Sequence, residues 1–155
     1  MNIRTTLDIF NLLKGRWDLS RTISTAKNKQ LINAHAEFLE TDNHTLHYKE
    51  TGTIDVNNTQ QHFYREYQYN YFPADEIIKS YFYEDSRQGN YFHTLKFHSQ
   101  SDDLVIAQDE HLCLQDNYKI RYTFCSGNID HFEIEYDVEG PAKKYQSTTS
   151  FNRKK

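Results

Sequence analysis

The sequence has few of the residues that staple small proteins or separate domains. Among its 155 residues are two cysteines, two prolines, five glycines, one methionine and one tryptophan. Two cysteines are too few for a disulfide framework, and free thiols fit a reducing compartment. Because so little proline and glycine leaves no flexible linker, we expect one domain over residues 1–155.

Two further absences bear on membranes and nucleic acid. No apolar run approaches the roughly 20 residues of a transmembrane helix, and the first residues lack the apolar segment of a secretory signal. The 18 basic and 22 acidic residues are interspersed and give a net charge of -4, whereas nucleic-acid binders usually carry a strongly basic face. We therefore expect a cytoplasmic protein that binds neither a membrane nor nucleic acid.

Aromatic residues, by contrast, are abundant, with 12 tyrosines and 10 phenylalanines. A short helix is predicted over about 6–14, with Thr5 or Thr6 as its cap and Gly15 at its end. After Gly15, apolar and polar residues alternate, which predicts β-strands with one buried face. About ten such segments follow, and their inward faces begin at Trp17, Ile32, Leu46, Phe63, Ile78, Tyr91, Val105, Tyr118, Phe132 and Tyr145.

This order of strands predicts an all-β fold. Consecutive antiparallel strands with one apolar face favour a single up-and-down barrel, here over about 16–153. Closure of the barrel removes the exposed edges that promote aggregation. Barrels of eight strands hold at most one small ligand, so a barrel of about ten strands has room for a cavity.

The start of the first strand carries a recognisable motif. Gly15-x-Trp17, between the short helix and the strand, is similar to the opening motif of calycins, the lipocalin and fatty-acid-binding barrels. Calycins place a basic side chain of the last strand over this tryptophan, and Arg153 has the strand parity to do so here. The resemblance implies a calycin-like barrel with Trp17 buried at its closed end.

Four longer blocks span nearly the whole chain. They are Gly15-Arg16-Trp17-x-Leu19-x-Arg21-x-Ile23, Tyr91-Phe92-His93-x-Leu95, His111-x-Cys113-x-x-Asp116-x-Tyr118 and Val138-x-Gly140-Pro141-x-Lys143-x-Tyr145. In order and spacing they resemble a small calycin- or lipocalin-like family that is known only as a domain of unknown function. The resemblance implies a barrel and supplies no established activity or cofactor.

Hairpin lengths predict which inward-facing residues are neighbours, because side-chain parity fixes the strand register. Four-residue loops at 114–117 and 139–142, a three-residue loop at 126–128 and a loop at 99–103 define the pairs. The predicted pairs are Cys113–Tyr118, Tyr118–Tyr136, Tyr136–Tyr145, Tyr91–His111 and His93–Asp109.

These registers predict a polar, aromatic interior. In a partly desolvated space, a fixed guanidinium binds a carboxylate or phosphate more strongly than the same group would in bulk water. The leading hypothesis is therefore binding of a small polar or anionic molecule inside the barrel, without a catalytic residue or metal ligand. The predicted ligand-binding residues are His93, His111, Cys113, Tyr118, Tyr136, Tyr145, Arg21 and Arg65.

Other functions remain open at this point. An enzyme could use His93, Asp109, His111 and Cys113 as base, orienting acid and nucleophile. The two histidines could also hold a metal with a third ligand, or one of them a haem. A protein-interaction module would instead have a filled interior. The sequence identifies neither the ligand, nor a cofactor, nor the oligomeric state.

Overall fold

The computed structural model describes residues 3–155, which form one short helix and eleven β-strands. The elements are α1 (Thr6–Leu13), β1 (Gly15–Ser24), β2 (Lys29–Asp42), β3 (Thr45–Val56), β4 (Thr59–Phe72), β5 (Ile77–Glu84), β6 (Arg87–Leu95), β7 (His98–Ser99), β8 (Leu104–Cys113), β9 (Asp116–Cys125), β10 (Asn128–Glu139) and β11 (Lys144–Arg153). Within the described residues, no helix is long and apolar enough to cross a membrane.

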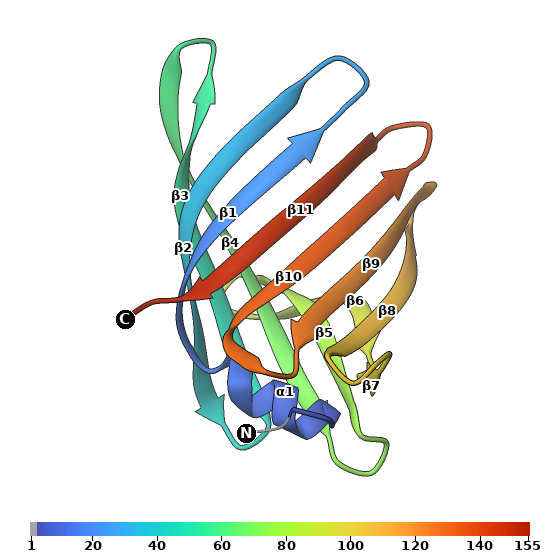
Figure 1. Cartoon of the computed structure of the whole chain (residues 1–155). Helices are drawn as coiled ribbons and strands as arrows, with labels where there is room; N and C mark the ends of the chain where they lie inside the picture. Colours follow the sequence, from blue (N-terminus) through green and yellow to red (C-terminus); the bar gives the residue numbers. More distant parts are fainter. Residues whose placement is uncertain (1–2) are drawn as a thin grey trace.

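The strands form one antiparallel sheet in the order β6-β5-β4-β3-β2-β1-β11-β10-β9-β8-β7. Figure 1 shows the sheet curled into a half-barrel, with α1 beneath its lower end. The predicted all-β, up-and-down, calycin-like fold is confirmed. The strand count exceeds the predicted ten because the two-residue strand β7 lies in the segment predicted as a loop.

A capping box fixes α1 at the lower end of the barrel. The Thr5 hydroxyl accepts a hydrogen bond from the Asp8 N–H at 3.1 Å, and the Asp8 carboxylate accepts one from the Thr5 N–H at 3.0 Å. Ile9, Phe10 and Leu13 of the helix are buried, so α1 covers the end of the barrel.

Trp17 is the centre of this closed end. It is fully buried, its Nε1 donates to the Leu13 carbonyl at 2.9 Å, and the Phe132 ring meets it edge-on at 4.8 Å. The Arg153 guanidinium lies 4.2 Å from the centre of the Trp17 ring. The predicted burial of Trp17 and its cation–π contact with Arg153 are both confirmed.

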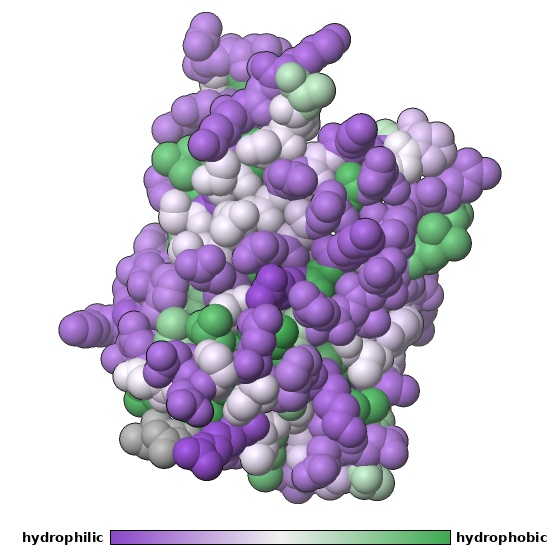
Figure 2. All heavy atoms as spheres, turned by 45° about the vertical axis from the view of Figure 1, so that its right-hand side comes forward, coloured by the Kyte–Doolittle hydropathy of each residue, from purple (hydrophilic) through white to green (hydrophobic). Residues whose placement is uncertain are grey.

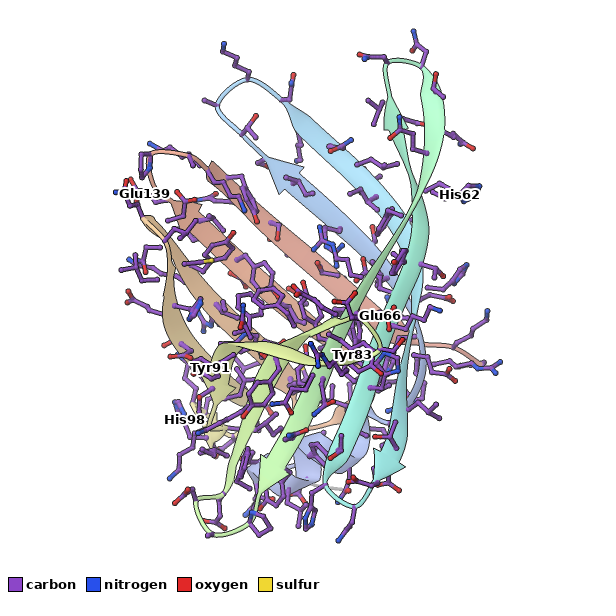
Figure 3. The ribbon with its side chains drawn as sticks, turned by 180° about the vertical axis from the view of Figure 1, so that it is seen from behind. His62, Glu66, Tyr83, Tyr91, His98 and Glu139 are labelled. Atoms are coloured by element: carbon purple, nitrogen blue, oxygen red, sulfur yellow. The ribbon has the colours of Figure 1, made fainter. Side chains whose placement is uncertain are left out.

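The half-barrel is covered by α1 at its lower end and is open in its upper half, near the opposite hairpin tips. Strand β5 pairs with β4 only over Tyr67–Phe72, so residues 59–66 of β4 form a free edge. Strands β6 and β8, both within the described residues, share no backbone ladder. In Figure 3, His62 lies on the part of β4 that rises above Tyr83 and Tyr91 of β5 and β6.

The predicted registers of β8 to β11 are wrong by two residues in each hairpin. A two-residue turn with Leu114 at a left-handed φ of 60° pairs Cys113 with Asp116 and His111 with Tyr118. Tyr118 then lies opposite Val138, and Val138 opposite Tyr145. A shift of two residues preserves the side-chain face, so the predicted inward faces of β9, β10 and β11 stand.

Two positions predicted to face inward do not. Cys113 is exposed because β8 ends at the hairpin tip, beyond the strands that cover the interior. Tyr91 is 42% exposed while its neighbour Phe92 is buried. Register irregularities between β5 and β6, around Tyr81, interrupt the alternation there.

Candidate functional site

A buried ion pair forms the floor of the open upper half. The Arg21 Nη1 and Nη2 atoms donate to Glu50 at 2.7 and 2.8 Å, and the Arg21 Nε donates to the Thr149 hydroxyl at 2.8 Å. The Tyr48 hydroxyl donates to the same Glu50 carboxylate at 2.5 Å. Burial alone would raise the pKa of Glu50, but the hydrogen bonds and charge of Arg21 hold that pKa below its usual range. The pair is therefore ionised and has no net charge.

Arg65 adds a second cation that this pair cannot neutralise. It is the Cα partner of Glu50 across β3 and β4, and it is partly buried. Among the described residues, no carboxylate lies within ion-pair distance of Arg65, because both oxygens of Glu50 face Arg21. Burial raises the pKa of the neighbouring Tyr67, and the positive charge of Arg65 opposes that rise. In the described residues, Arg65 thus has no carboxylate of its own as an ion-pair partner.

Tyrosine hydroxyls surround this cation. Burial raises the pKa of Tyr136 and of Tyr145, so both remain protonated donors at neutral pH. Within residues 3–155, neither hydroxyl has a hydrogen-bond partner, whereas the Tyr118 hydroxyl accepts a bond from Lys143 Nζ at 3.0 Å. Burial and the neighbouring Tyr118 raise the pKa of Tyr145, and the charges of Arg65 and Lys143 oppose that rise.

Beneath Arg65 there is little space. A cavity of about 20 Å³ remains, which is room for one water molecule. The hydrogen bond between the Tyr69 and Tyr122 hydroxyls, 2.8 Å long, crosses the packed interior. The cavity is lined by Arg21, Tyr48, Glu50, Arg65, Tyr67, Tyr69, Ile134, Tyr136, Thr149 and Phe151. This packed part of the interior therefore has no room for a ligand larger than water.

The two histidines occupy different surroundings. His93 is buried, its Nδ1 lies 3.0 Å from the Ser80 hydroxyl, and its Nε2 has no partner. Burial, with a smaller effect from His111, lowers the pKa of His93 to about 3. His111 is partly buried and contacts the rings of Tyr91 and Phe92. His93 thus belongs to the packed interior, and His111 borders the opening.

Within the described residues, neither the predicted His93–Asp109 pair nor the alternative pair of His111 with Cys113 forms a hydrogen bond. Asp109 accepts a hydrogen bond from the Thr94 N–H at 2.7 Å and so links β8 to β6. Cys113 is exposed at the tip of β8. The structure therefore does not join these residues by hydrogen bonds, and a ligand contact of the exposed Cys113 stays a prediction.

In the described part of the chain, no group of three His, Cys, Asp or Glu could hold a metal ion. A haem at His93 would have to displace the rings of Phe92 and Tyr122, whose centres lie 4.5 and 5.7 Å from the His93 ring. The arrangement therefore offers an arginine and tyrosine hydroxyls rather than metal ligands.

Of the predicted residues, the structure brings together Arg21, Arg65, Tyr118, Tyr136 and Tyr145. Glu50 has the parity of an inward-facing residue, but its bond with Arg21 needs the three-dimensional register. Tyr67 and Lys143 were not predicted as site residues. The parity of β4 is a signal for Tyr67, whereas the loop residue Lys143 has no comparable signal.

Two larger hollows lie outside the barrel. One of about 510 Å³ crosses the outer face of β8 to β11, and one of about 610 Å³ crosses that of β2 to β4. Figure 2 shows one face of the molecule, largely hydrophilic with scattered hydrophobic residues. The hollows are grooves of a twisted sheet, and Arg65 lies inside the barrel instead.

Fold and site together define an open calycin-like barrel with a polar, aromatic interior. The chain belongs to the family described as "Family of unknown function (DUF6314)", whose model matches residues 13–153. No curated protein matches the sequence significantly.

Solved structures share the fold at low identity. The S-type phycobiliprotein lyase CPES from Guillardia theta is 11% identical, with a TM-score of 0.66 over 97% of this chain and 93% of the lyase chain. Rv2717c from M. tuberculosis is 9% identical, with a TM-score of 0.57 over 97% of this chain and 98% of its own. At these identities the similarity establishes the barrel fold alone.

Proposed function

We propose that the protein binds a small anionic molecule in the open upper half of its barrel, with the acid group at Arg65. The observation that carries this proposal is the missing counter-charge of Arg65. This guanidinium faces the interior, is partly buried, and has no carboxylate within ion-pair distance in the described part of the chain. A partly buried guanidinium without its own carboxylate is favourable for an anionic ligand, whose acid group would supply the missing counter-charge.

The surroundings of Arg65 strengthen such a contact. The hydroxyls of Tyr136 and Tyr145 are protonated and without partners, so they can donate to the same ligand. Hydrogen bonds from charged donors are stronger than neutral ones, and the partly excluded water lowers the local dielectric constant. The Arg21–Glu50 pair stays internally neutral and supports the floor without competing for the ligand.

The same groups favour binding over catalysis. Glu50 is held ionised by Arg21, and the raised pKa values of Tyr136 and Tyr145 keep their protons in place. Such groups hold a ligand rather than exchange protons with it near neutral pH. We therefore propose a binding protein.

The test compares two ligands of nearly identical shape, 2-naphthoate and uncharged 2-naphthamide, by isothermal titration calorimetry. We expect the acid to bind roughly tenfold to a hundredfold more tightly, the usual range for one charged hydrogen-bonded contact. Arg65→Met should abolish that preference. Arg16→Met is the matched control, because Arg16 is exposed on the outside of β1 and paired with Glu37 at 3.3 Å. Equal affinities for acid and amide, or an unchanged preference in Arg65→Met, would contradict the proposal.

A further inference from the structure

The rings beside Arg65 specify the body of the ligand as well as its acid group. Five aromatic side chains form what we call the ring wall: Tyr67, Phe82, Phe92, Tyr118 and Tyr136. They come from β4, β5, β6, β9 and β10. The ring wall therefore spans the gap between β6 and β8, where the backbone forms no ladder.

The contacts within the ring wall are regular. The rings of Tyr67 and Phe92 are stacked at 5.9 Å, and those of Phe82 and Phe92 at 4.7 Å. Tyr118 and Tyr136 meet Phe92 edge-on at 6.0 and 6.1 Å. Both geometries are favoured between aromatic rings, and a further flat ring can join them by the same contacts.

The cation lies at one end of the ring wall. Arg65 precedes Tyr67 by two residues on the same face of β4, and its charge affects the pKa of Tyr67 and of Tyr136. A ligand whose acid group reaches Arg65 therefore has its body beside these two rings. A saturated body would forfeit aromatic contacts and would cover the Tyr136 hydroxyl without offering it a π-face or an acceptor.

Phe92 at the centre of the ring wall is buried in the core, but the rings around it differ from the packed core in their accessibility. Trp17, Phe124 and Phe132 at the closed end are fully buried. Tyr118 and Tyr136 are only partly buried. Rings that line an opening and keep accessible surface are available to a ligand, whereas rings of the closed end are already in contact on every side.

We infer that the ligand is a flat aromatic acid, its carboxylate, phosphate or sulfonate at Arg65 and its ring against Tyr67 and Tyr136. This inference rests on the proposed function and adds the chemical class of the ligand. The aromatic ring is selected by the ring wall, and the acid group by Arg65.

The test compares 2-naphthoate with decahydro-2-naphthoate, which has the same carboxylate and carbon skeleton but a puckered, saturated body. We expect the flat acid to bind about tenfold more tightly in calorimetry. Its ring protons should shift upfield in proton NMR on binding, because they enter the ring currents of Tyr67 and Tyr136.

Substitutions test which side chain causes the preference for the flat acid. Tyr136→Leu should reduce the preference for the flat acid to less than threefold, whereas Tyr136→Phe, which keeps the ring, should preserve it. Tyr64→Leu is the control, because Tyr64 is 69% exposed on the outer face of β4. If Tyr136→Leu does not fold, judged by near-ultraviolet circular dichroism, Tyr118→Leu replaces it.

The outcomes separate this inference from the proposed function. If both acids bind equally and both depend on Arg65, the aromatic class is wrong and the anion site stands. The inferred aromatic ligand is also wrong if the preference for 2-naphthoate remains in both leucine variants and its ring protons show no upfield shift. If neither acid binds, or if binding does not depend on Arg65, the proposed function is wrong and this inference with it.

Discussion

The same alternating sequence pattern leads to different surroundings in the two halves of this barrel. In the lower half, inward-facing Trp17, Phe124 and Phe132 are fully buried under α1. In the upper half, inward-facing Arg65, Tyr118 and Tyr136 keep accessible surface. An inward-facing position is therefore buried in the core or left accessible according to whether neighbouring elements cover it.

Strand length accounts for the difference in cover. Strand β4 has 14 residues and its neighbour β5 has 8, so β4 extends six residues further, or about 20 Å at the rise of a β-strand. The long hairpins of β1 to β4 rise beyond the short β5–β6 hairpin in Figure 1. Their inner faces are left without a covering strand, and these faces carry both apolar residues such as Ile54 and Phe63 and charged residues such as Arg65.

The largest expected difference between the halves is the cost of deleting an aromatic ring. Trp17→Ala should destabilise the protein by about 3–5 kcal/mol, the usual range for a fully buried large aromatic residue. Phe63→Ala, in the partly buried upper half, should cost less than half as much. Urea denaturation at equilibrium measures both. Equal losses would show that the upper half is as tightly packed as the lower.

The Arg21–Glu50 ion pair lies between the two halves and can be removed by substitution. Glu50→Gln should cost about 3 kcal/mol, because it leaves a buried guanidinium without its counter-charge. The pKa of Glu50 is lower in the folded protein than the unfolded value of 4.5. Its contribution is therefore complete above pH 4.5 and is lost as the pH falls toward the folded value.

The control for this variant is Glu66→Gln. Glu66 is on the neighbouring strand β4, is less buried, and pairs with His47 at 2.7 Å. Its substitution should cost less than about 1 kcal/mol, as for most accessible ion pairs. Chemical denaturation between pH 3 and 7 compares the two variants, and similar losses would contradict the buried, ionised state of the Arg21–Glu50 pair.

The sequence predicts the fold more accurately than it predicts which residues pair across each hairpin. Period-two alternation locates the strands and their inward faces, because parity is a local property of the chain. The turn at Leu114 decides the register, and a left-handed φ at a leucine has no sequence signal comparable to glycine or asparagine. The predicted β8–β9 pairs are therefore displaced by two residues, while the faces are right.

For the site, residue type and parity were sufficient for Arg21, Arg65 and Tyr136, which do lie together. They were insufficient for His93, because burial depends on the rings packed around it from other strands. They failed at Cys113, because parity does not show where a strand outruns its neighbours. The sequence therefore does not show which inward-facing side chains are covered by other strands.

Acid should affect the lower half through His93. The pKa of His93 is lowered to about 3 in the folded protein. Below pH 6.5 the unfolded chain therefore carries a proton on this histidine that the folded protein does not bind. Stability is complete above pH 6.5, and about 2 kcal/mol should be lost by pH 5, at 1.36 kcal/mol per unit.

The measurement is the denaturation free energy of His93→Leu at pH 7 and pH 5. This variant should lose clearly less stability between the two values than the wild-type protein does. His35→Gln, at an exposed histidine beside Asp18, should keep the wild-type pH dependence. An unchanged acid loss in His93→Leu would show that other groups cause it.

The seam between β6 and β8 offers a smaller test. Asp109→Ala removes the acceptor of the Thr94 N–H and should cost about 1.5–3 kcal/mol at most, the range for a hydrogen bond to a charged group. Hydrogen–deuterium exchange should accelerate at Thr94 and along β6, but not at Trp17. Asp109→Asn, which keeps an acceptor oxygen, should restore most of the protection. Unchanged exchange in Asp109→Ala would mean that aromatic contacts alone hold the seam.

The smallest effects are expected at the two thiols, which lie at opposite ends of the β8–β9 hairpin. Cys113 is at the upper tip, opposite Asp116, and Cys125 is at the other end, opposite Leu104. Both are free and exposed, so a disulfide-forming reagent such as DTNB should modify both in the native protein at rates within about tenfold of each other. Because neither side chain is part of a packed core, Cys113→Ser and Cys125→Ser should each change stability by no more than about 0.5 kcal/mol. Strong protection of Cys113 in the native protein would mean that the upper half closes over the tip of β8, and the contrast between a covered and an open half would then fail at its upper end.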